Sequence, residues 1–227
     1  MFLHTKLETR TDPIKIAFIG CGKFVSMFLA QYNHLNKIQI DSIVDININQ
    51  AKKNCLNSGL SSETIQNINF ADNLDKVFNR EIDVFIEATG NPIAGTLHAK
   101  KIIESKKHVI MVNVEADVLA GASLSKEAKS AGVVYSMAYG DQPALTAEIV
   151  DWARSSGFYV TAAGKGTKYL PKYHKSTPDT VWNYYGLTAK DANEAGMNPK
   201  MFNSFLDGTK SSLEMAAIAN ACNLKVP

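Results

Sequence analysis

Short apolar runs alternate with longer amphipathic segments through the first part of the chain. The earliest apolar run, 14–19, leads into a segment of helical periodicity at 24–35. Nearly continuous apolar runs of this length are typical of parallel strands that are covered on both faces. Their alternation with helices predicts an α/β domain, a Rossmann-type doubly wound parallel sheet, over residues 1–150. Later apolar runs lie at 38–45, 82–87, 108–113 and 133–139, and helical segments at 95–107 and 124–132.

A glycine-rich turn, Gly20-Cys21-Gly22, closes the first predicted strand. Gly20 permits a tight turn, and Gly22 lets the backbone approach a pyrophosphate without a Cβ in the way. The helix that begins near Lys23 and Phe24 would present N–H groups and the positive end of its dipole to the phosphates. The turn therefore predicts that these glycines, with Lys23 and Phe24, bind a dinucleotide. A plain strand-to-helix turn is the alternative.

An acidic residue, Asp45, ends the second predicted strand. A carboxylate there can accept hydrogen bonds from the adenine-ribose hydroxyls. Against a 2′-phosphate about 4 Å away it would cost roughly 4 kcal/mol at an effective dielectric constant near 20. No arginine follows at Ile46 or Asn47 to offset that repulsion. The sequence therefore favours NAD over NADP, although a carboxylate that turns away would leave NADP open.

Two further strand ends offer polar residues. Thr89 and Gly90 follow the strand that ends near Glu87, and Asn113 and Glu115 come at the end of the next one. Ligands of open α/β sheets lie in the crevice at the carboxyl ends of the strands. Thr89, Gly90 and Asn113 are therefore predicted to line the nicotinamide half of the site, with Glu115 a catalytic candidate in the same crevice. A solvated acidic turn is the alternative.

A basic, glycine-containing segment follows a predicted strand at 158–162. Gly164 and Gly166 free the backbone around Lys165, and Lys168 lies three positions further on. Hydride transfer at a carbonyl needs a group that polarises the oxygen and exchanges its proton, and a lysine near a second ammonium group can do both. Lys165 and Lys168 are therefore predicted to be catalytic. A solvated basic loop is the alternative.

A second polar cluster lies near the end of the chain. Asp207, Lys210 and Glu214 are spaced by three and four residues, so a helix beginning near Asp207 would carry them on one face. Asp207 and Lys210 are predicted to complete a substrate site. An N-capping aspartate beside an ordinary surface ion pair explains the spacing equally well.

Composition narrows the class of protein. The 227 residues carry a net charge of +2, with 45% hydrophobic and 20% charged residues, so neither nucleic acid nor a membrane is expected as a partner. Three widely spaced cysteines form no disulfide framework, which favours a cytoplasmic setting. Residues 151–227 are too few for a large independent core, so they are expected to begin an α+β catalytic domain that is incomplete here.

Several stretches together resemble one enzyme family. They include "IGCGKFVSMFLAQ", "HVIMVNVEADVLAG", "AAGKGTKYLPKYHKSTPDTVW" and "MNPKMFNSFLDGTKSSLEMAAIANA". The chain resembles the N-terminal part of the homoserine-dehydrogenase-like oxidoreductases with a C-terminal SAF domain, a group that includes deoxyxylulose-phosphate reductoisomerase-like enzymes. Val25 departs from the family's glycine motif.

The resemblance implies an NAD(P)-dependent oxidoreductase that acts on a CH–OH donor and forms a homo-oligomer. One branch of the family reduces and rearranges deoxyxylulose phosphate in isoprenoid biosynthesis, using NADPH. Homoserine dehydrogenase is an alternative, but Glu115 stands about where such enzymes carry an Asn-Lys pair. A third hypothesis is a regulator that binds a dinucleotide but catalyses no reaction.

The lysines and this family together suggest a small substrate that is phosphorylated or carboxylated. Reductoisomerase chemistry would also use a divalent metal ion held by oxygen ligands. The spacing of the carboxylates singles out no such site; the candidates are Glu115, Asp141, Asp179 and Asp207.

Overall fold

The structure, a computed structural model, describes residues 2–226. These residues form two compact units that divide between Tyr139 and Gly140. The boundary expected at residue 150 would fall inside helix α7 (Gln142–Ser155), and the whole of that helix belongs to the second unit.

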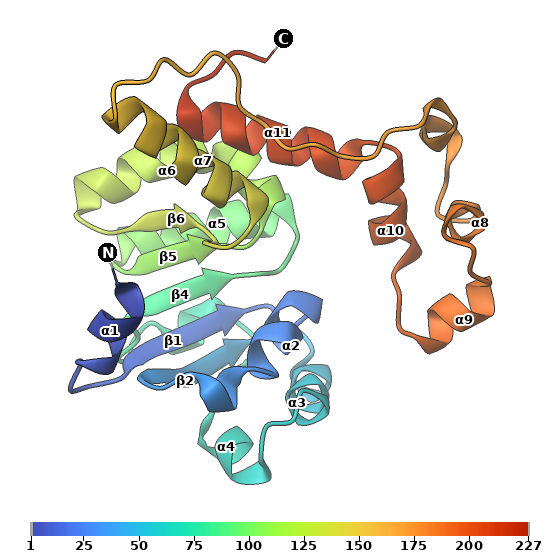
Figure 1. The fold of residues 1–227 in the computed structure, drawn as a ribbon. Helices are drawn as coiled ribbons and strands as arrows, with labels where there is room; N and C mark the ends of the chain where they lie inside the picture. Colours follow the sequence, from blue (N-terminus) through green and yellow to red (C-terminus); the bar gives the residue numbers. More distant parts are fainter. Residues whose placement is uncertain (1, 227) are drawn as a thin grey trace. The chain divides into compact units, whose positions relative to one another are not determined.

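The first unit is built on a parallel sheet of six strands in the order β3-β2-β1-β4-β5-β6 (Figure 1). This is the strand order of the doubly wound dinucleotide-binding fold, so the predicted Rossmann-type architecture is confirmed. The chain proceeds outward from β1 in one direction and then returns to build the other half from β4. The strands are β1 (Ile14–Ile19), β2 (Ile38–Val44), β3 (Asn69–Ala71), β4 (Val84–Glu87), β5 (His108–Met111) and β6 (Tyr135–Met137).

Both faces of this sheet are covered, which explains the nearly continuous apolar strands. In β1, Ala17 and Ile19 pack toward helices α5 and α6, whereas Ile16 and Phe18 pack toward helices α2 and α3. All four side chains are buried. The helices of this unit are α1 (Leu3–Glu8), α2 (Lys23–Leu29), α3 (Ile48–Asn57), α4 (Ser62–Asn67), α5 (Pro92–Glu104) and α6 (Val114–Ala131), with short 3-10 helices η1 (Tyr32–His34) and η2 (Leu74–Val77).

Helix α2 is shorter than its periodicity predicts. It ends at Leu29, and η1 replaces the helical turn expected toward residue 35. Tyr32 packs partly buried against the core beside α2, and its hydroxyl accepts a hydrogen bond from the Ile40 N–H at 3.4 Å. Packing of this ring against the sheet therefore replaces the last helical turns.

The described part of the second unit is helical (Figure 1). Helices α7 and α11 pack together through Val150, Ile218 and Cys222, and a separate aromatic cluster gathers around Trp182. The strand predicted at 158–162 does not form, since no strand within residues 140–226 is available to pair with it. The helices that follow α7 are η3 (Pro171–Lys175), α8 (Val181–Tyr185), α9 (Ala189–Glu194), α10 (Pro199–Leu206) and α11 (Thr209–Cys222).

A buried carboxyl group links α6 to the last strand of the sheet. Asp117 is only 7% exposed, and the Tyr135 hydroxyl donates to its Oδ1 at 2.7 Å. Burial raises the pKa of the Asp117 carboxyl, and the hydrogen bond from Tyr135 opposes that rise only in part. The folded chain therefore holds this proton more tightly than the unfolded chain does. Its contribution to stability is present below the unfolded pKa and is lost as pH rises through the folded pKa.

Asp117→Asn should therefore become relatively more stable as pH rises. The amide retains an acceptor for Tyr135 but does not titrate, so the difference in unfolding free energy, variant minus wild type, should increase from pH 4 to pH 7. Chemical unfolding at a series of pH values measures that difference. Asp151→Asn, on the exposed surface of α7, is the matched control and should show no such trend. A pH-independent difference for Asp117→Asn would contradict the assignment.

Candidate functional site

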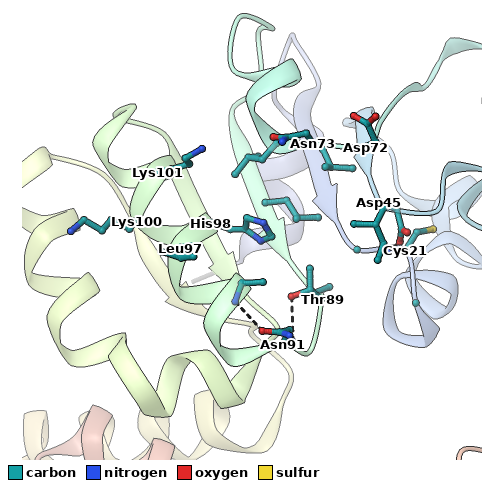
Figure 2. Close-up of a pocket in the computed structure, with 18 of the residues that line it drawn as sticks. Cys21, Asp45, Asp72, Asn73, Thr89, Asn91, Leu97, His98, Lys100 and Lys101 are labelled. Atoms are coloured by element: carbon teal, nitrogen blue, oxygen red, sulfur yellow. Dashed lines mark hydrogen bonds between the residues drawn. The ribbon is translucent and has the colours of Figure 1, made fainter.

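A pocket of about 950 Å³ opens at the carboxyl ends of the first four strands (Figure 2). Its lining includes Gly20, Gly22, Asp45 and Thr89, which the sequence had singled out. These residues come from the ends of β1, β2 and β4, so the sheet brings them together although they are distant in sequence. The sequence did not single out other members of the lining, namely Asp72, Asn73, Leu97, His98 and Lys101.

The glycine turn passes very close to the end of β4. Gly20 has a φ of 86°, and a Cβ on it would lie 3.0 Å from the carbonyl oxygen of Ala88. Only glycine can adopt this positive φ and also lie this close to the Ala88 carbonyl without strain. At Gly22, by contrast, a Cβ would meet no described atom within 4 Å, so the space in front of that backbone is open.

The other two residues predicted at the turn lie beside the pocket. Lys23 and Phe24 form the first turn of α2, and both side chains are exposed. Neither side chain belongs to the lining of the pocket. Their part in cofactor binding stays a prediction.

Asp45 is held by two backbone donors. Its Oδ2 accepts a hydrogen bond from the Cys21 N–H at 2.8 Å, and its Oδ1 accepts one from the Asn47 N–H, also at 2.8 Å. The carboxylate therefore faces the glycine turn from the end of β2. Each oxygen retains a further lone pair that can accept a ribose hydroxyl.

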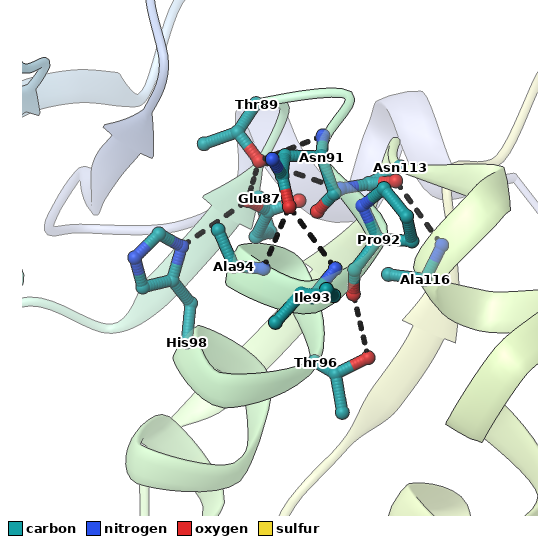
Figure 3. Close-up of polar contacts among 10 residues, drawn as sticks. All are labelled: Glu87, Thr89, Asn91, Pro92, Ile93, Ala94, Thr96, His98, Asn113 and Ala116. Carbon is teal, nitrogen blue, oxygen red and sulfur yellow. Dashed lines mark hydrogen bonds and ion pairs between the residues drawn. The ribbon is translucent and has the colours of Figure 1, made fainter.

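A buried polar network lies behind Thr89 (Figure 3). Glu87 has no exposed surface, and its Oε1 accepts a hydrogen bond from the Thr89 hydroxyl at 2.5 Å. The Nδ1 of His98 lies 3.3 Å from the same oxygen. The Thr89 oxygen also accepts from the Asn91 N–H at 3.4 Å and from Asn113 Nδ2 at 3.3 Å, so the network engages both the proton and the lone pairs of this hydroxyl.

Asn113 is part of this network and does not line the pocket. Its Nδ2 donates to the carbonyl oxygen of Asn91 at 2.9 Å, and its Oδ1 accepts from the Ala116 N–H at 3.1 Å, which caps α6. Gly90, on the same loop as Thr89, is exposed and has a φ of 69°. Asn113 therefore holds the loop after β4 from behind, and direct cofactor contact by Asn113 or Gly90 stays a prediction.

Gly95 makes this arrangement sterically possible. A Cβ on Gly95 would run into the amide of Asn113 and would lie 2.9 Å from the Ala116 Cβ and 3.0 Å from Glu87 Oε2. The sequence showed Gly95 only as a residue within a predicted helix. Thr89 and Asn113, which the sequence had placed in the same crevice, were the members of this network that it singled out.

Glu115 lies on a helix and not at a strand end. Strand β5 ends at Met111 and α6 begins at Val114, so Glu115 stands in the first turn of α6, half-buried. The polar residue that follows β5 directly is Asn113, whose side chain caps the helix. Glu115 was expected at the end of a strand, and that expectation is wrong. A short connection separates the end of β5 from the helix that carries Glu115.

In the second unit, Lys165 finds a carboxylate partner. Its Nζ contacts Glu214 Oε2, and the Lys210 Nζ lies 3.8 Å from Glu214 Oε1. Glu214 is 2% exposed, while the side chains of Lys165 and Lys210 are 23% and 27% exposed. Lys168, the partner that the sequence suggested for Lys165, has an exposed side chain. Two ammonium groups thus flank one buried carboxylate, and we call these three residues the Lys-Glu-Lys cluster.

Asp207 does not share the helical face of Lys210 and Glu214. It is the C-terminal cap of α10; its Oδ2 accepts from Asn203 Nδ2 and its Oδ1 from the Thr209 N–H, both at 2.9 Å. Gly208, with a φ of 90°, breaks the chain between the two helices. A helix does begin close to Asp207, since α11 starts at Thr209, but Asp207 itself lies outside that helix. The predicted shared face is therefore wrong, and Asp207 holds the junction between the two helices.

The four candidate metal ligands lie on separate elements. Asp141 caps α7 by accepting from the Gln142 N–H at 2.9 Å, and Asp179 lies exposed on a loop. Throughout residues 2–226, no three side chains of His, Cys, Asp or Glu lie together in a way that could hold a metal ion. In the same described range, no helix is both long and apolar enough to cross a membrane.

Family comparisons follow the division into two units. Residues 14–139 match the oxidoreductase family with the NAD-binding Rossmann fold, and this match covers more than half of the 227 residues. The chain belongs to this NAD-binding oxidoreductase family. Residues 140–227 match the catalytic domain of the oxidoreductase DRL. The resemblance to the group that carries a C-terminal SAF domain stays a prediction.

Several solved structures are similar to this chain at low sequence identity. DOX-P reductoisomerase, solved in complex with NADPH, fosmidomycin and magnesium, is 14% identical, with a TM-score of 0.61 over 93% of this chain and 59% of its own. The WlbA dehydrogenase from Bordetella pertussis, in complex with NADH and UDP-GlcNAcA, is 18% identical, with a TM-score of 0.47 over 64% of this chain and 42% of its own. A homoserine dehydrogenase from Thiobacillus denitrificans is 17% identical, with a TM-score of 0.47 over 64% and 33%.

This oxidoreductase chain spans about 40% of the length of several solved oxidoreductases that it matches. No curated protein sequence matches it.

Asp45→Asn should weaken NADH binding and narrow the preference for NADH over NADPH. The substitution removes the charge that a 2′-phosphate would face, and its amide can accept from only one of the two N–H donors. We expect the ratio of dissociation constants, NADPH over NADH, to fall by about tenfold or more, which is about 1.4 kcal/mol. Fluorescence titrations of both reduced cofactors measure the ratio. Asp12→Asn, in the exposed segment before β1, is the control. An unchanged ratio for Asp45→Asn would remove Asp45 from cofactor selection.

Proposed function

We propose that this oxidoreductase transfers a hydride between a nicotinamide cofactor and a small hydroxy or keto substrate. The observation that carries the proposal is the pocket at the carboxyl ends of β1 to β4, where the Gly20 turn and the Asp45 carboxylate meet. The open backbone at Gly22 suits a pyrophosphate, and the carboxylate suits a ribose diol.

The Lys-Glu-Lys cluster supports an anionic substrate. Two ammonium groups against one carboxylate leave a net positive charge, and both lysine side chains remain partly exposed. Ammonium groups bind phosphate and carboxylate groups strongly. Lys165 also has the chemistry to polarise a carbonyl oxygen and to exchange its proton during hydride transfer. We therefore propose Lys165 as the catalytic acid–base group and Lys210 as an anion-binding group.

Within this class, deoxyxylulose phosphate or a related sugar phosphate is the substrate that we favour. The support is the sequence resemblance to reductoisomerase-like enzymes, together with the match of residues 140–227 to the DRL catalytic domain. A phosphorylated ketose has the two groups that the proposal needs, a carbonyl that accepts hydride and a phosphate that binds ammonium groups.

Cofactor titration followed by a substrate screen tests the proposal. The intact protein is titrated with NADH and with NADPH while nicotinamide fluorescence is recorded, and it is then assayed with sugar phosphates and with homoserine. Saturable binding of NADH and oxidation of it by a sugar phosphate are the expected results. Binding of neither cofactor would overturn the proposal. Binding without turnover of any substrate would favour a regulator, and turnover of homoserine would favour the dehydrogenase alternative.

Lys165→Met should lower kcat by about 100-fold or more, because acid–base groups contribute on that scale. Methionine keeps most of the side-chain length but removes the ammonium group. Steady-state kinetics with the substrate found in the screen measures the loss. Lys190→Met, on the exposed surface of α9, is the matched control and should be silent. A loss below about threefold for Lys165→Met would exclude an acid–base role.

A further inference from the structure

Two side chains hold Cys21, the middle residue of the glycine turn, by its backbone N–H and its backbone carbonyl. The N–H of Cys21 donates to Asp45 Oδ2 at 2.8 Å, and the carbonyl oxygen of Cys21 accepts from Asn54 Nδ2 at 2.7 Å. Asp45 comes directly after β2, and Asn54 lies on α3, the next helix along the chain. The connection after the second strand therefore holds the turn that follows the first.

These two contacts belong to a closed ring of hydrogen bonds. Asn54 Oδ1 accepts from Gln50 Nε2 at 2.9 Å, and the N–H of Gln50 donates to Asn47 Oδ1 at 3.0 Å. The N–H of Asn47 then donates to Asp45 Oδ1 at 2.8 Å, which returns the ring to its start. We call the ring formed by Cys21, Asp45, Asn47, Gln50 and Asn54 the turn clasp.

The clasp fixes the direction of the next backbone donor. The C=O of Cys21 and the N–H of Gly22 belong to one planar trans peptide, so the two bonds point in opposite directions. With the C=O bonded to Asn54 on α3, the Gly22 N–H points away from α3. Within residues 2–226, no acceptor is bonded to this N–H, and Gly22 lines the pocket with open space before it.

We propose that Asn54 is a positioning residue for the cofactor, supported by Gln50. By holding the Cys21 carbonyl, Asn54 keeps the Gly22 N–H aimed at the pyrophosphate of the dinucleotide. This inference rests on the proposed cofactor binding and adds residues to it that touch no ligand themselves. The clasp also links Asp45, which faces the ribose, to the turn that faces the phosphates, so the two contacts act as one unit.

The first test compares two identical substitutions on α3. Asn54→Leu keeps the number of side-chain heavy atoms and the branch at Cγ but removes both hydrogen bonds, and NADH should bind about tenfold more weakly. Asn57→Leu makes the same change at an exposed position one turn further along α3 and should bind NADH as the wild type does. Equal NADH affinities for Asn54→Leu and the wild type would overturn the proposal. So would an equal loss in both variants.

A combined variant separates positioning from general destabilisation. Gln50→Leu should weaken NADH binding about threefold in the wild-type background, because Gln50 acts only by orienting the Asn54 amide. In the Asn54→Leu background it should have no further effect. Independent losses that multiply would contradict a shared ring. Thermal unfolding of every variant checks that the protein is folded at the temperature of the titration.

A ligand-free measurement keeps the clasp testable if the proposed function fails. Amide hydrogen exchange at Cys21 reports the turn directly, because this N–H is bonded within the clasp. Exchange should become about tenfold faster in Asn54→Leu and remain unchanged in Asn57→Leu. If the wild type binds neither cofactor, the proposed function falls, and faster exchange then shows a clasp without that ligand. Unchanged exchange in Asn54→Leu would overturn the clasp whatever the cofactor does.

Discussion

The close approach between the Gly20 turn and the end of β4 is the constraint on which the site depends. A side chain at residue 20 would meet the Ala88 carbonyl and the Thr89 backbone at 3.0 Å, and the positive φ would add strain. Because glycine stands there, β1 and β4 pair in register up to the point at which the chain turns. This pair is where the strand order reverses, and the crevice of a doubly wound sheet opens at that point.

Carboxylates at two strand ends serve this constraint in different ways. Asp45 directly follows β2, is half-buried, and accepts hydrogen bonds from two backbone N–H groups on the pocket side. Glu87 ends β4 fully buried and binds the Thr89 hydroxyl from behind the pocket. Each carboxylate therefore holds a loop in place through hydrogen bonds to that loop. An acid at the end of a strand in this fold is thus as much a loop anchor as a ligand contact.

The fold could be predicted because its signals are local. Each strand is a short apolar run, and the Gly20 turn follows directly in sequence, so β1, β2, β4 and β5 were found with nearly correct bounds. Where the structure differed, a distant contact decided. Packing of Tyr32 against the sheet shortened α2, and the lack of a pairing strand left residues 158–162 irregular.

The site was predicted less completely, and the reason is again distance along the chain. Gly20, Gly22, Asp45 and Thr89 could be placed because the carboxyl ends of parallel strands must meet at one edge. The partner of Lys165 could not be, since Glu214 lies on α11 and no periodicity relates the two residues. Periodicity linked Glu214 to Asp207, but Gly208, with a positive φ, separates the two helices, and Asp207 is the C-terminal cap of α10.

The geometry of Asp45 strengthens the sequence argument on cofactor choice. That argument left NADP open, since a carboxylate free to rotate could turn away from a 2′-phosphate. Two backbone N–H groups, one on each oxygen, oppose such rotation, because turning the carboxylate away would leave both donors unpaired.

The repulsion between Asp45 and a 2′-phosphate, roughly 4 kcal/mol at 4 Å and halved or more by solvent at this half-buried position, would then have to be offset by a cation. Lys52, in the first half of α3, lies with its ammonium 5.2 Å from the Phe70 ring, and Lys101 is paired with Asp75. Moving either ammonium to a 2′-phosphate would break an existing contact, and NAD therefore stays the predicted cofactor.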